Sequence, residues 1–271
     1  MLFPDHLILL RGGGDLATGV AYRLHKAGFP LIVLELPHPL VVRRRVALAT
    51  AVLEGEVAVE DLRAVRVETP EQARVLALDG AIPVLVSPEL PPTLLNSSLV
   101  VDARMAKRTL DTRIDQAPLV VALGPGFTAG VDCHAVIETN RGHRLGRVIW
   151  QGPAESNTGT PGVVGGKGAE RVLRAPVAGV VAWDKEIGDR VREGERLGDV
   201  ADRPVVAPFD GVVRGLIAPG TAVPAEIKIG DVDPRGDVDA CFTISEKALA
   251  IGGGVLEAIL THLSTQQGRE S

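Results

Sequence analysis

The first thirty residues change from an apolar run to a glycine turn and then to apolar positions at helical spacing. Residues 7–10 are continuously apolar, which predicts a strand buried on both faces in a parallel sheet. Residues 12–14 are three consecutive glycines. Apolar residues recur at helical spacing over 16–27, and Gly28 supplies a helix end. This stretch predicts a strand, a glycine turn and a helix.

Further along the chain, short apolar runs alternate with helical segments. Thr69 and Pro70 form a helix start, with Thr69 as the N-cap and Pro70 at the first helical position. Residues 41–53 mix apolar and basic side chains and predict no clear element. The strands predicted by apolar runs lie over residues 31–36, 82–86, 98–101 and 118–123. The alternation favours an α/β unit with a mainly parallel sheet.

From residue 172 the pattern changes to short β segments with an internal repeat. APVAGVV at 175–181 is echoed by APFDGVV at 207–213, and IGDRVREGERL runs between them. This repeat resembles the biotinyl/lipoyl-like barrel-sandwich hybrid. Carrier members of that family hold a Lys between the two halves, whereas no Lys occurs here between Lys185 and Lys228. The resemblance therefore implies a rigid β module that braces, dimerises or covers the first domain, and a homo-oligomer is one such arrangement.

The predicted fold class is α/β, in four parts. A Rossmann-like domain with a mainly parallel sheet covers residues 1–150, and a Gly/Pro-rich linker covers 151–171. A small all-β barrel-sandwich-hybrid domain covers 172–240, and a C-terminal helix over 241–271 packs back on the first domain. Three glycines within a helix each cost ~1 kcal/mol relative to Ala. Either the last helix breaks at Gly252, or close approach to another backbone or a ligand compensates, and we favour the break.

Composition narrows the range of partners. The formal net charge is −5 and the pI about 5.7, so the chain offers no electrostatic reason to bind nucleic acid or an anionic membrane. No apolar stretch is expected to reach the ~18 residues of a membrane span, and the first apolar run lacks the cationic start of a signal peptide. The two cysteines form no disulfide framework and fit a reducing, cytoplasmic location.

The glycine turn matches a dinucleotide-binding fingerprint. Gly12, Gly14 and Ala17 have the GxGxxA spacing, with Gly13 between the first two. Glu35 ends the next apolar run, where an acidic side chain can accept hydrogen bonds from a ribose. Asp15 argues against the site, because its carboxylate could cap the helix and repel a phosphate. The alternative is a glycine turn that only joins a strand to a helix.

Other candidate ligand-binding residues follow predicted strands. In an open parallel sheet, ligands bind beyond the carboxyl ends of the strands. Asp102 and Arg104 end one strand, and Gly124 and Gly126 follow another. Arg104 could bind a carboxylate or phosphate with two hydrogen bonds, or it could form a structural pair with Asp102. These residues extend the predicted cofactor-binding set.

A Cys next to a His suggests thiolate chemistry. If residues 131–139 form a strand, Cys133 faces the core, while Asp132, His134 and Glu138 share the other face. In a loop, Cys133 and His134 could both reach the crevice, and the His could lower the thiol pKa. The candidate catalytic residues are Cys133, His134 and Asp132. Three residues on one strand face are thin support for a metal, so no metal site is predicted.

Four motifs together resemble one family. LILLRGGGDLATGVAYRL, GPGFTAGVDCHAVIETNRGH, RAPVAGV and ISEKALAIGGGVLEAIL look like the YqeB family, accessory proteins of the selenium-dependent molybdenum hydroxylase system. The first part is also similar to the XdhC group of xanthine dehydrogenase maturation factors. The resemblance implies a cytoplasmic protein that helps to mature a molybdenum hydroxylase, with the hydroxylase or its maturation proteins as partners.

The residues and the resemblance support one main hypothesis and two alternatives. The glycine turn and Glu35 would hold an NAD(P)- or FAD-like nucleotide or the nucleotide end of a molybdenum cofactor, and Cys133, if accessible, would carry selenium or sulfur. One alternative is an NAD(P)-dependent oxidoreductase, for which the chain offers only the surroundings of His134 and the single Tyr22. The other is a scaffold without enzymatic activity. The sequence leaves the question of catalytic turnover open.

Overall fold

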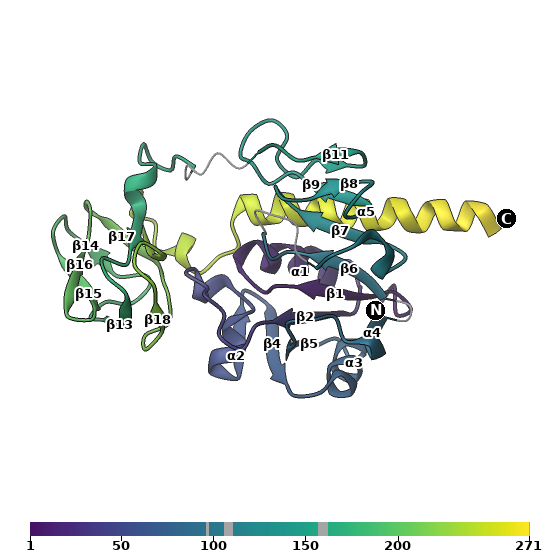
Figure 1. The fold of residues 1–271 in the computed structure, drawn as a ribbon, viewed down its shortest axis with the longest axis horizontal. Helices are drawn as coiled ribbons and strands as arrows, with labels where there is room; N and C mark the ends of the chain where they lie inside the picture. Colours follow the sequence, from purple (N-terminus) through teal and green to yellow (C-terminus); the bar gives the residue numbers. More distant parts are fainter. Residues whose placement is uncertain (96–97, 106–110, 157–161, 271) are drawn as a thin grey trace. The chain divides into compact units, whose positions relative to one another are not determined.

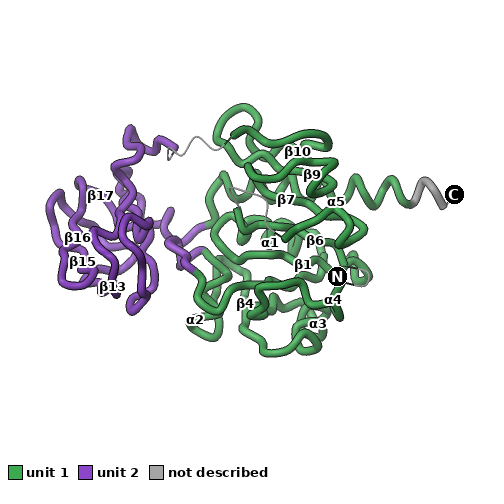
Figure 2. The backbone as a smooth tube through the Cα atoms, viewed as in Figure 1, with its two compact units in different colours: residues 1–39, 47–157, 244–271 green, residues 40–46, 158–243 purple. Residues whose placement is uncertain are grey.

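The computed structural model describes residues 1–95, 98–105, 111–156 and 162–270. The chain divides into two compact units (Figure 2). Unit 1 comprises residues 1–39, 47–157 and 244–271, and unit 2 comprises 40–46 and 158–243. Residues 40–46, for which the sequence predicted no element, thus belong to the second unit although the first unit surrounds them in sequence.

Unit 1 is built on a nine-stranded mixed sheet (Figure 1). Its strand order is β10-β9-β7-β6-β1-β2-β5-β4-β3. In this order, each neighbouring pair of strands between β9 and β4 is parallel. The outer pairs, β9–β10 and β3–β4, are antiparallel. The strands are β1 (Leu7–Arg11), β2 (Leu31–Glu35), β3 (Glu56–Val59), β4 (Leu62–Val67), β5 (Ile82–Val86), β6 (Ser98–Asp102), β7 (Val120–Leu123), β9 (Ala135–Ile137) and β10 (Val148–Ile149). A separate two-stranded sheet pairs β8 (Thr128–Ala129) with β11 (Gly152–Pro153).

Helices cover both faces of this sheet. Ala73 and Ala77 of α3 and Leu94 of α4 pack in one apolar cluster with Leu7 and Leu9. Because side chains alternate along a strand, Ile8 and Leu10 face the opposite side, where α1 and α5 pack against each other. The helices of unit 1 are α1 (Asp15–Lys26), α2 (Thr50–Glu54), α3 (Pro70–Leu78), α4 (Pro92–Leu95) and α5 (Glu246–Glu270), with a 3₁₀ turn η2 (Ile114–Gln116).

The predicted start of α3 is confirmed. The Thr69 hydroxyl accepts a hydrogen bond from the Gln72 backbone N–H at 3.2 Å, and Pro70 occupies the first helical position. The predicted break at Gly252 is wrong, because α5 continues from Glu246 to Glu270. Gly252 lies against the carbonyl oxygen of Gly19 on α1, so its missing side chain permits close helix packing.

Among the described residues, α5 is the one helix long and apolar enough to cross a membrane by length and composition, over Glu246–Gln266. This corrects the expectation that no apolar stretch reaches that length. Length and composition are weak support for a membrane span, since a core helix of a globular protein can share both. Here Val255, Ala258 and Ile259 are fully buried within unit 1, which explains the apolar sequence.

Unit 2 contains two four-stranded antiparallel sheets, ordered β12-β19-β17-β14 and β16-β15-β13-β18. The repeated APxxGVV motifs lead into β13 and β17, which lie in different sheets. Leu197, Val212 and Ile229 are among its fully buried core residues. The strands are β12 (Val172–Arg174), β13 (Gly179–Trp183), β14 (Arg190–Val191), β15 (Arg196–Val200), β16 (Arg203–Val206), β17 (Gly211–Leu216), β18 (Ala222–Val223) and β19 (Lys228–Asp233), with 3₁₀ turns η1 (Arg44–Val46), η3 (Ala169–Arg171) and η4 (Asp239–Cys241).

The predicted fold class is wrong. In place of a Rossmann-like domain and a barrel-sandwich hybrid, the described chain has a large mixed sheet and several antiparallel sheets. In unit 1, β5 rather than β4 pairs with β2, and antiparallel hairpins form both edges. Apolar runs and repeats predict where strands lie, but pairing depends on contacts between distant residues, which these local patterns do not contain.

Candidate functional site

The predicted glycine turn connects β1 to α1 at the carboxyl edge of the large sheet. Gly12 has φ +92° and donates its N–H to Leu34 O at 2.8 Å. Gly14 is the N-cap of α1 in an extended conformation, and no side chain caps the helix. Apart from its two chain neighbours, no heavy atom of the described residues lies within 4 Å of where a Cβ of Gly14 would stand. Asp15 is therefore the first helical residue and not the cap, and the backbone at Gly14 is open to an approaching ligand.

Glu35 ends β2 beside this turn. Its Oε1 accepts the N–H of Gly13 at 2.9 Å, and its Oε2 accepts the N–H of Leu36 at 2.5 Å. The predicted proximity of Glu35 to the glycine turn is thus observed. Each carboxylate oxygen has a second lone pair, so Glu35 can still accept a hydrogen bond from a ligand hydroxyl.

Asp102 and Arg104 lie where the strand order reverses between β1 and β6. Asp102 is fully buried at the end of β6. Arg104 donates Nη2 to Asp102 Oδ2 at 2.6 Å and Nε to Asp102 Oδ1 at 3.1 Å. A Cβ at Gly12 would lie 3.3 Å from the backbone of Arg104. The structure therefore shows Arg104 paired with Asp102, next to the glycine turn.

Sequence reasoning missed three members of this cluster. Arg11, at the end of β1, is 2% exposed and donates Nη1 to Thr112 Oγ1 at 2.8 Å and Nη2 to Asp111 Oδ2 at 2.6 Å. Arg104 donates Nη1 to Asp111 Oδ1 at 2.9 Å, and the Thr112 hydroxyl donates to Asp102 at 2.5 Å. A charged residue at the end of an apolar strand was the available signal for Arg11. We name Arg11, Asp102, Arg104, Asp111 and Thr112 the edge cluster.

The edge cluster predicts a pH dependence of stability. Partial burial raises the pKa of Asp111, but the hydrogen bonds from Arg11 and Arg104 outweigh it and lower the pKa from 3.8 to about 2. A carboxyl group with a lowered folded-state pKa stabilises the protein above its unfolded pKa, and that contribution is lost as the pH falls through the folded pKa. Because the Asp111 side chain is 52% exposed, solvent screening reduces the contribution to about 1 kcal/mol.

Asp111→Asn should therefore lower the free energy of unfolding by about 1 kcal/mol at pH 7. The difference from the wild type should shrink below about pH 4 and vanish near pH 2. Urea unfolding of both proteins across this pH range measures it. A difference that stays constant down to pH 2 would contradict the assigned role.

Gly124 and Gly126 follow β7 at the same carboxyl edge and have positive φ of +70° and +103°. A Cβ at Gly124 would overlap the Thr139 side chain, so this glycine makes room for the end of β9. There, the buried Glu138 accepts the N–H groups of Asn140 and Glu155 at 2.7 and 2.8 Å. These residues share the edge with the glycine turn, but the observed contacts of Glu138 are structural.

Lys247 was also missed by sequence reasoning. It lies in the first turn of α5 and is half-buried. Burial and the charge of Arg141 lower the pKa of Lys247, while the charges of Asp15, Glu138 and Glu246 act in the opposite direction. The α5 N-terminus thus brings a lysine close to the start of α1. No local signal distinguishes this lysine, because Asp15 is more than two hundred residues away in sequence.

The three predicted catalytic residues lie elsewhere. His134 precedes β9 and is hydrogen-bonded to Val120, the first residue of β7. The backbone N–H of His134 donates to Val120 O at 2.8 Å, and the N–H of Val120 donates to His134 Nδ1 at 3.0 Å. Asp132 accepts the N–H of Thr128 at 2.8 Å. His134 therefore lies at the amino edge of the parallel sheet, opposite the edge that carries the glycine turn. The structure does not join the predicted catalytic and cofactor-binding sets into one site.

Cys133 is unsuited to thiolate chemistry. It is fully buried in the apolar cluster with Val120, Ala122 and Phe127. Burial, together with the charges of Asp132 and Asp102, raises the pKa of its thiol to about 12. Burial also lowers the pKa of His134. The predicted role of Cys133 required solvent access to its thiol, and the structure shows no such access. Among the described residues the other cysteine, Cys241, is buried too.

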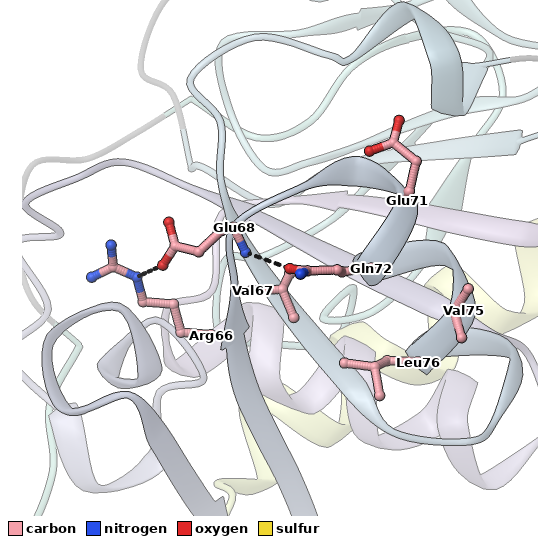
Figure 3. A pocket seen from close by; sticks show the side chains of 7 residues that line it. All are labelled: Arg66, Val67, Glu68, Glu71, Gln72, Val75 and Leu76. Atoms are coloured by element: carbon pink, nitrogen blue, oxygen red, sulfur yellow. Dashed lines mark hydrogen bonds and ion pairs between the residues drawn. The ribbon is translucent and has the colours of Figure 1, made fainter.

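A cavity of about 530 Å³ opens on α3 and the end of β4 (Figure 3). Glu68 accepts a hydrogen bond from Arg66 at 3.0 Å and donates its N–H to Gln72 at 3.2 Å. None of the predicted site residues lines the cavity, so the cavity does not extend the candidate site. It is lined by Arg66, Val67, Glu68, Glu71, Gln72, Val75 and Leu76. Within the described ranges, no group of three or more His, Cys, Asp or Glu residues could hold a metal ion.

Comparison with known proteins bears on the predicted family. The uncharacterized protein YqeB of Escherichia coli K12 is 48% identical over an alignment that covers 96% of this chain. This match supports the YqeB family. The chain spans about half of that relative, 49% of its length, and no protein-family model matches the chain. The name of this relative states no activity, so the link to molybdenum hydroxylases stays a prediction.

Solved structures add only distant likenesses. A succinylglutamate desuccinylase/aspartoacylase from Rhodobacter sphaeroides is 26% identical, over 31% of this chain and 29% of its own, with a TM-score of 0.21. An aspartoacylase family protein from Mesorhizobium loti is 12% identical over 84% of both chains, with a TM-score of 0.27. The ectoine utilization protein EutE from Ruegeria pomeroyi is 13% identical, over 86% of this chain and 59% of its own, with a TM-score of 0.23. Such low TM-scores support no conclusion about function.

Proposed function

We propose that this protein is a cytoplasmic accessory protein of a selenium-dependent molybdenum hydroxylase system. In this proposal unit 1 binds a phosphate-bearing ligand, either a nucleotide or the nucleotide end of a molybdenum cofactor, at the N-terminus of α1. The likeness to the YqeB family supports the system, and the open backbone at Gly14 supports the binding step. A molybdenum hydroxylase, or one of its maturation proteins, is the proposed partner.

The observation that carries the binding step is the uncapped start of α1. A helix N-terminus attracts anions because its first N–H groups lack partners within the helix and the macrodipole is positive there. Gly14 caps α1 without a side chain, and the space where its Cβ would stand is empty. A phosphate can therefore approach the backbone closely.

Neighbouring side chains fit the rest of such a ligand. Glu35 lies one hydrogen bond from Gly13 and can accept a hydrogen bond from a ribose hydroxyl. The ammonium of Lys247 offsets the negative charge of Asp15, with which it interacts electrostatically. The proposal gives no chalcogen-carrying role to Cys133, because its thiol is buried and protonated. The protein would bind and present the cofactor, which supplies the molybdenum chemistry itself.

Gly14→Asp tests this proposal with a variant that should fold. Asp is a preferred N-cap residue, and Gly14 has φ −66°, which any residue adopts. Its carboxylate would cap α1 and repel a phosphate, so we expect nucleotide binding to weaken about tenfold or more. Gly14→Ala is the matched comparison, because its methyl group fills the space at Gly14 without adding charge. It should weaken binding less than Gly14→Asp, and the difference between the two variants isolates the charge repulsion.

The measurement combines two readouts on the full chain. Mass spectrometry identifies small molecules retained by the purified wild type, and calorimetry compares their binding with that of both variants. Maturation of a co-expressed molybdenum hydroxylase should fall with Gly14→Asp and persist with Gly14→Ala. Equal binding by Gly14→Asp and the wild type, or a wild type that binds no nucleotide or cofactor, would disprove the ligand site.

A further inference from the structure

Two arginines at the carboxyl edge of unit 1 share one exposed carboxylate. Arg11 donates Nη2 to Asp111 Oδ2 at 2.6 Å, and Arg104 donates Nη1 to Asp111 Oδ1 at 2.9 Å. The side chain of Asp111 is 52% exposed, whereas those of Arg11 and Arg104 are 2% and 23% exposed. We name Arg11 and Arg104 the arginine pair. Because Asp111 is half-exposed, solutes can reach the oxygens that the arginine pair binds.

Buried partners hold the arginine pair independently of this carboxylate. Arg11 also donates Nη1 to Thr112 Oγ1 at 2.8 Å. Arg104 donates Nη2 to Asp102 Oδ2 at 2.6 Å and Nε to Asp102 Oδ1 at 3.1 Å, and Asp102 is fully buried. Both guanidinium groups would therefore keep their positions if the exposed carboxylate moved away, and a site that is already in place costs less to fill.

Asp111 is held less firmly than the arginine pair. Among the described residues, its carboxylate accepts hydrogen bonds from the arginine pair alone, while its backbone O accepts Nε2 of Gln116 at 2.8 Å. Partial burial raises the pKa of Asp111, but the hydrogen bonds from the arginine pair outweigh it and lower the pKa to about 2. The side chain is thus an anion near neutral pH, and a half-exposed ion pair is weak. Another anion can therefore replace it.

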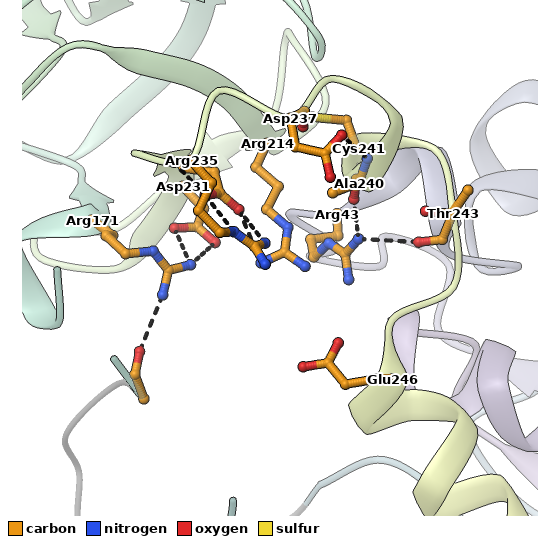
Figure 4. A network of polar contacts seen from close by, with 12 residues as sticks. Arg43, Arg171, Arg214, Asp231, Arg235, Asp237, Ala240, Cys241, Thr243 and Glu246 are labelled. Carbon is orange, nitrogen blue, oxygen red and sulfur yellow. Dashed lines mark hydrogen bonds and ion pairs between the residues drawn. The ribbon is translucent and has the colours of Figure 1, made fainter. Parts of the chain in front are cut away.

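Two arginines of unit 2 show the opposite arrangement. Arg171 donates Nη2 to both oxygens of Asp231, at 2.9 and 2.8 Å (Figure 4). Arg235 donates Nε and Nη2 to Asp233, at 3.0 and 2.7 Å. Asp231 and Asp233 are 3% and 0% exposed, so solutes do not reach the oxygens that these arginines bind. The exposed carboxylate distinguishes the arginine pair of unit 1 from them.

The arginine pair adjoins the ligand site proposed at the start of α1. Arg11 directly precedes Gly12, and a Cβ at Gly12 would lie 3.3 Å from the backbone of Arg104. Gly14, the N-cap of α1, is two residues further along the chain, and two residues span at most about 7 Å. A group at the start of α1 and a group at the arginine pair can therefore belong to one small molecule.

We propose that the arginine pair binds a second phosphate of the ligand, and that this phosphate replaces the carboxylate of Asp111. The inference rests on the proposed function, because it takes the first phosphate to lie at α1. Two phosphate oxygens can accept the N–H groups that Asp111 accepts in this structure, and guanidinium groups are well suited to phosphate. One anion leaves as another arrives, so the exchange needs no unpaired arginine. The ligand class is then a compound with two linked phosphates, such as a nucleoside diphosphate.

Asp111→Asn tests this exchange, with inorganic pyrophosphate as the probe. Asn keeps the size of the side chain but loses the charge, so it competes less for the arginine pair. We expect calorimetric titration of the full chain to show pyrophosphate binding about fivefold tighter than in the wild type, which corresponds to about 1 kcal/mol. The matched control is Asp115→Asn, which removes the same charge from a 71% exposed side chain four residues further on. This control should bind pyrophosphate like the wild type.

Stability and affinity should change in opposite directions in Asp111→Asn. Without a ligand the variant should unfold more easily, because it lacks the ion pairs of Asp111, yet pyrophosphate should raise its melting temperature more than that of the wild type. A purely structural Asp111 predicts looser arginines and weaker binding instead. Unchanged or weaker pyrophosphate binding by Asp111→Asn would overturn the proposal. So would inorganic phosphate that binds the wild type as tightly as pyrophosphate, because the second phosphate would then contribute nothing.

The Gly14→Asp variant separates this inference from the proposed function. If Gly14→Asp weakens pyrophosphate binding while Asp111→Asn leaves it unchanged, the site at α1 stands and the exchange is overturned. If Asp111→Asn tightens binding while Gly14→Asp has no effect, the arginine pair is supported as a phosphate site and the site at α1 is disproved. A wild type that binds no pyrophosphate overturns the inference, whereas a nucleotide retained by the purified protein would still support the proposed function.

Discussion

Replacing Gly252 with Ala should lower the free energy of unfolding by about 2–3 kcal/mol, although Ala is the better helix former. A Cβ at Gly252 would overlap the carbonyl oxygen of Gly19 on α1. On the other helix, a Cβ at Gly19 would overlap the backbone of Ala248. The two helices touch through their backbones, so even one methyl group must push them apart. Urea unfolding measures the change.

The neighbouring glycine provides the matched control. Apart from its chain neighbours and the backbone of α5 itself, no heavy atom of the described residues lies within 4 Å of where a Cβ of Gly253 would stand. Gly253→Ala should therefore stabilise the protein by about 0.5–1 kcal/mol, since Ala loses less conformational freedom in a helix than Gly. Opposite signs at adjacent positions would identify the close contact between α1 and α5 as the reason for Gly252. Two stabilising changes would mean that the helices do not pack this closely.

Replacing Arg104 with Leu should destabilise the protein by about 3 kcal/mol or more. Asp102 is fully buried, and Arg104 supplies its forked ion pair. Among the described residues, removing Arg104 leaves the buried carboxylate with the hydroxyl of Thr112 and a backbone N–H as donors, which is the costly outcome for a buried pair. Urea unfolding at neutral pH measures the loss.

Two further variants show whether the unpaired charge causes this loss. Adding Asp102→Asn to Arg104→Leu removes the charge and should recover a large part of the stability, as a double-mutant cycle would reveal. Arg113→Gln is the surface control, because Arg113 and Asp115 are both about 70% exposed and form a pair of little energetic weight. If Arg104→Leu were no more harmful than Arg113→Gln, the edge cluster would not support the carboxyl edge.

Local patterns were sufficient for several elements of unit 1. The apolar run over residues 7–10 and the glycines after it predicted β1 and the turn into α1, and both are observed. The same reasoning failed at Gly252, where local helix propensity favours a break. Packing of the Gly252 face against Gly19 outweighs that propensity, as tertiary contacts commonly do.

The candidate site was predicted only in part, and strand direction explains much of the difference. Glu35 lies beside the glycine turn because both follow adjacent parallel strands. Cys133 and His134 come before β9, and so they lie at the other end of the sheet. The sequence pattern extended this strand back to residue 131, whereas Val131 is 67% exposed and β9 begins at Ala135.

The sequence by itself determined the short apolar strands, the Thr69 cap and the glycine turn, because hydrophobic spacing and capping act between residues a few positions apart. Only the tertiary structure decided the strand order and which partners each charged side chain contacts. Arg11 meets Thr112 across 101 positions, and Arg171 meets Asp231 across 60. Such pairs form because the folded sheets bring residues together that are far apart in sequence. Local patterns along the chain do not predict these contacts.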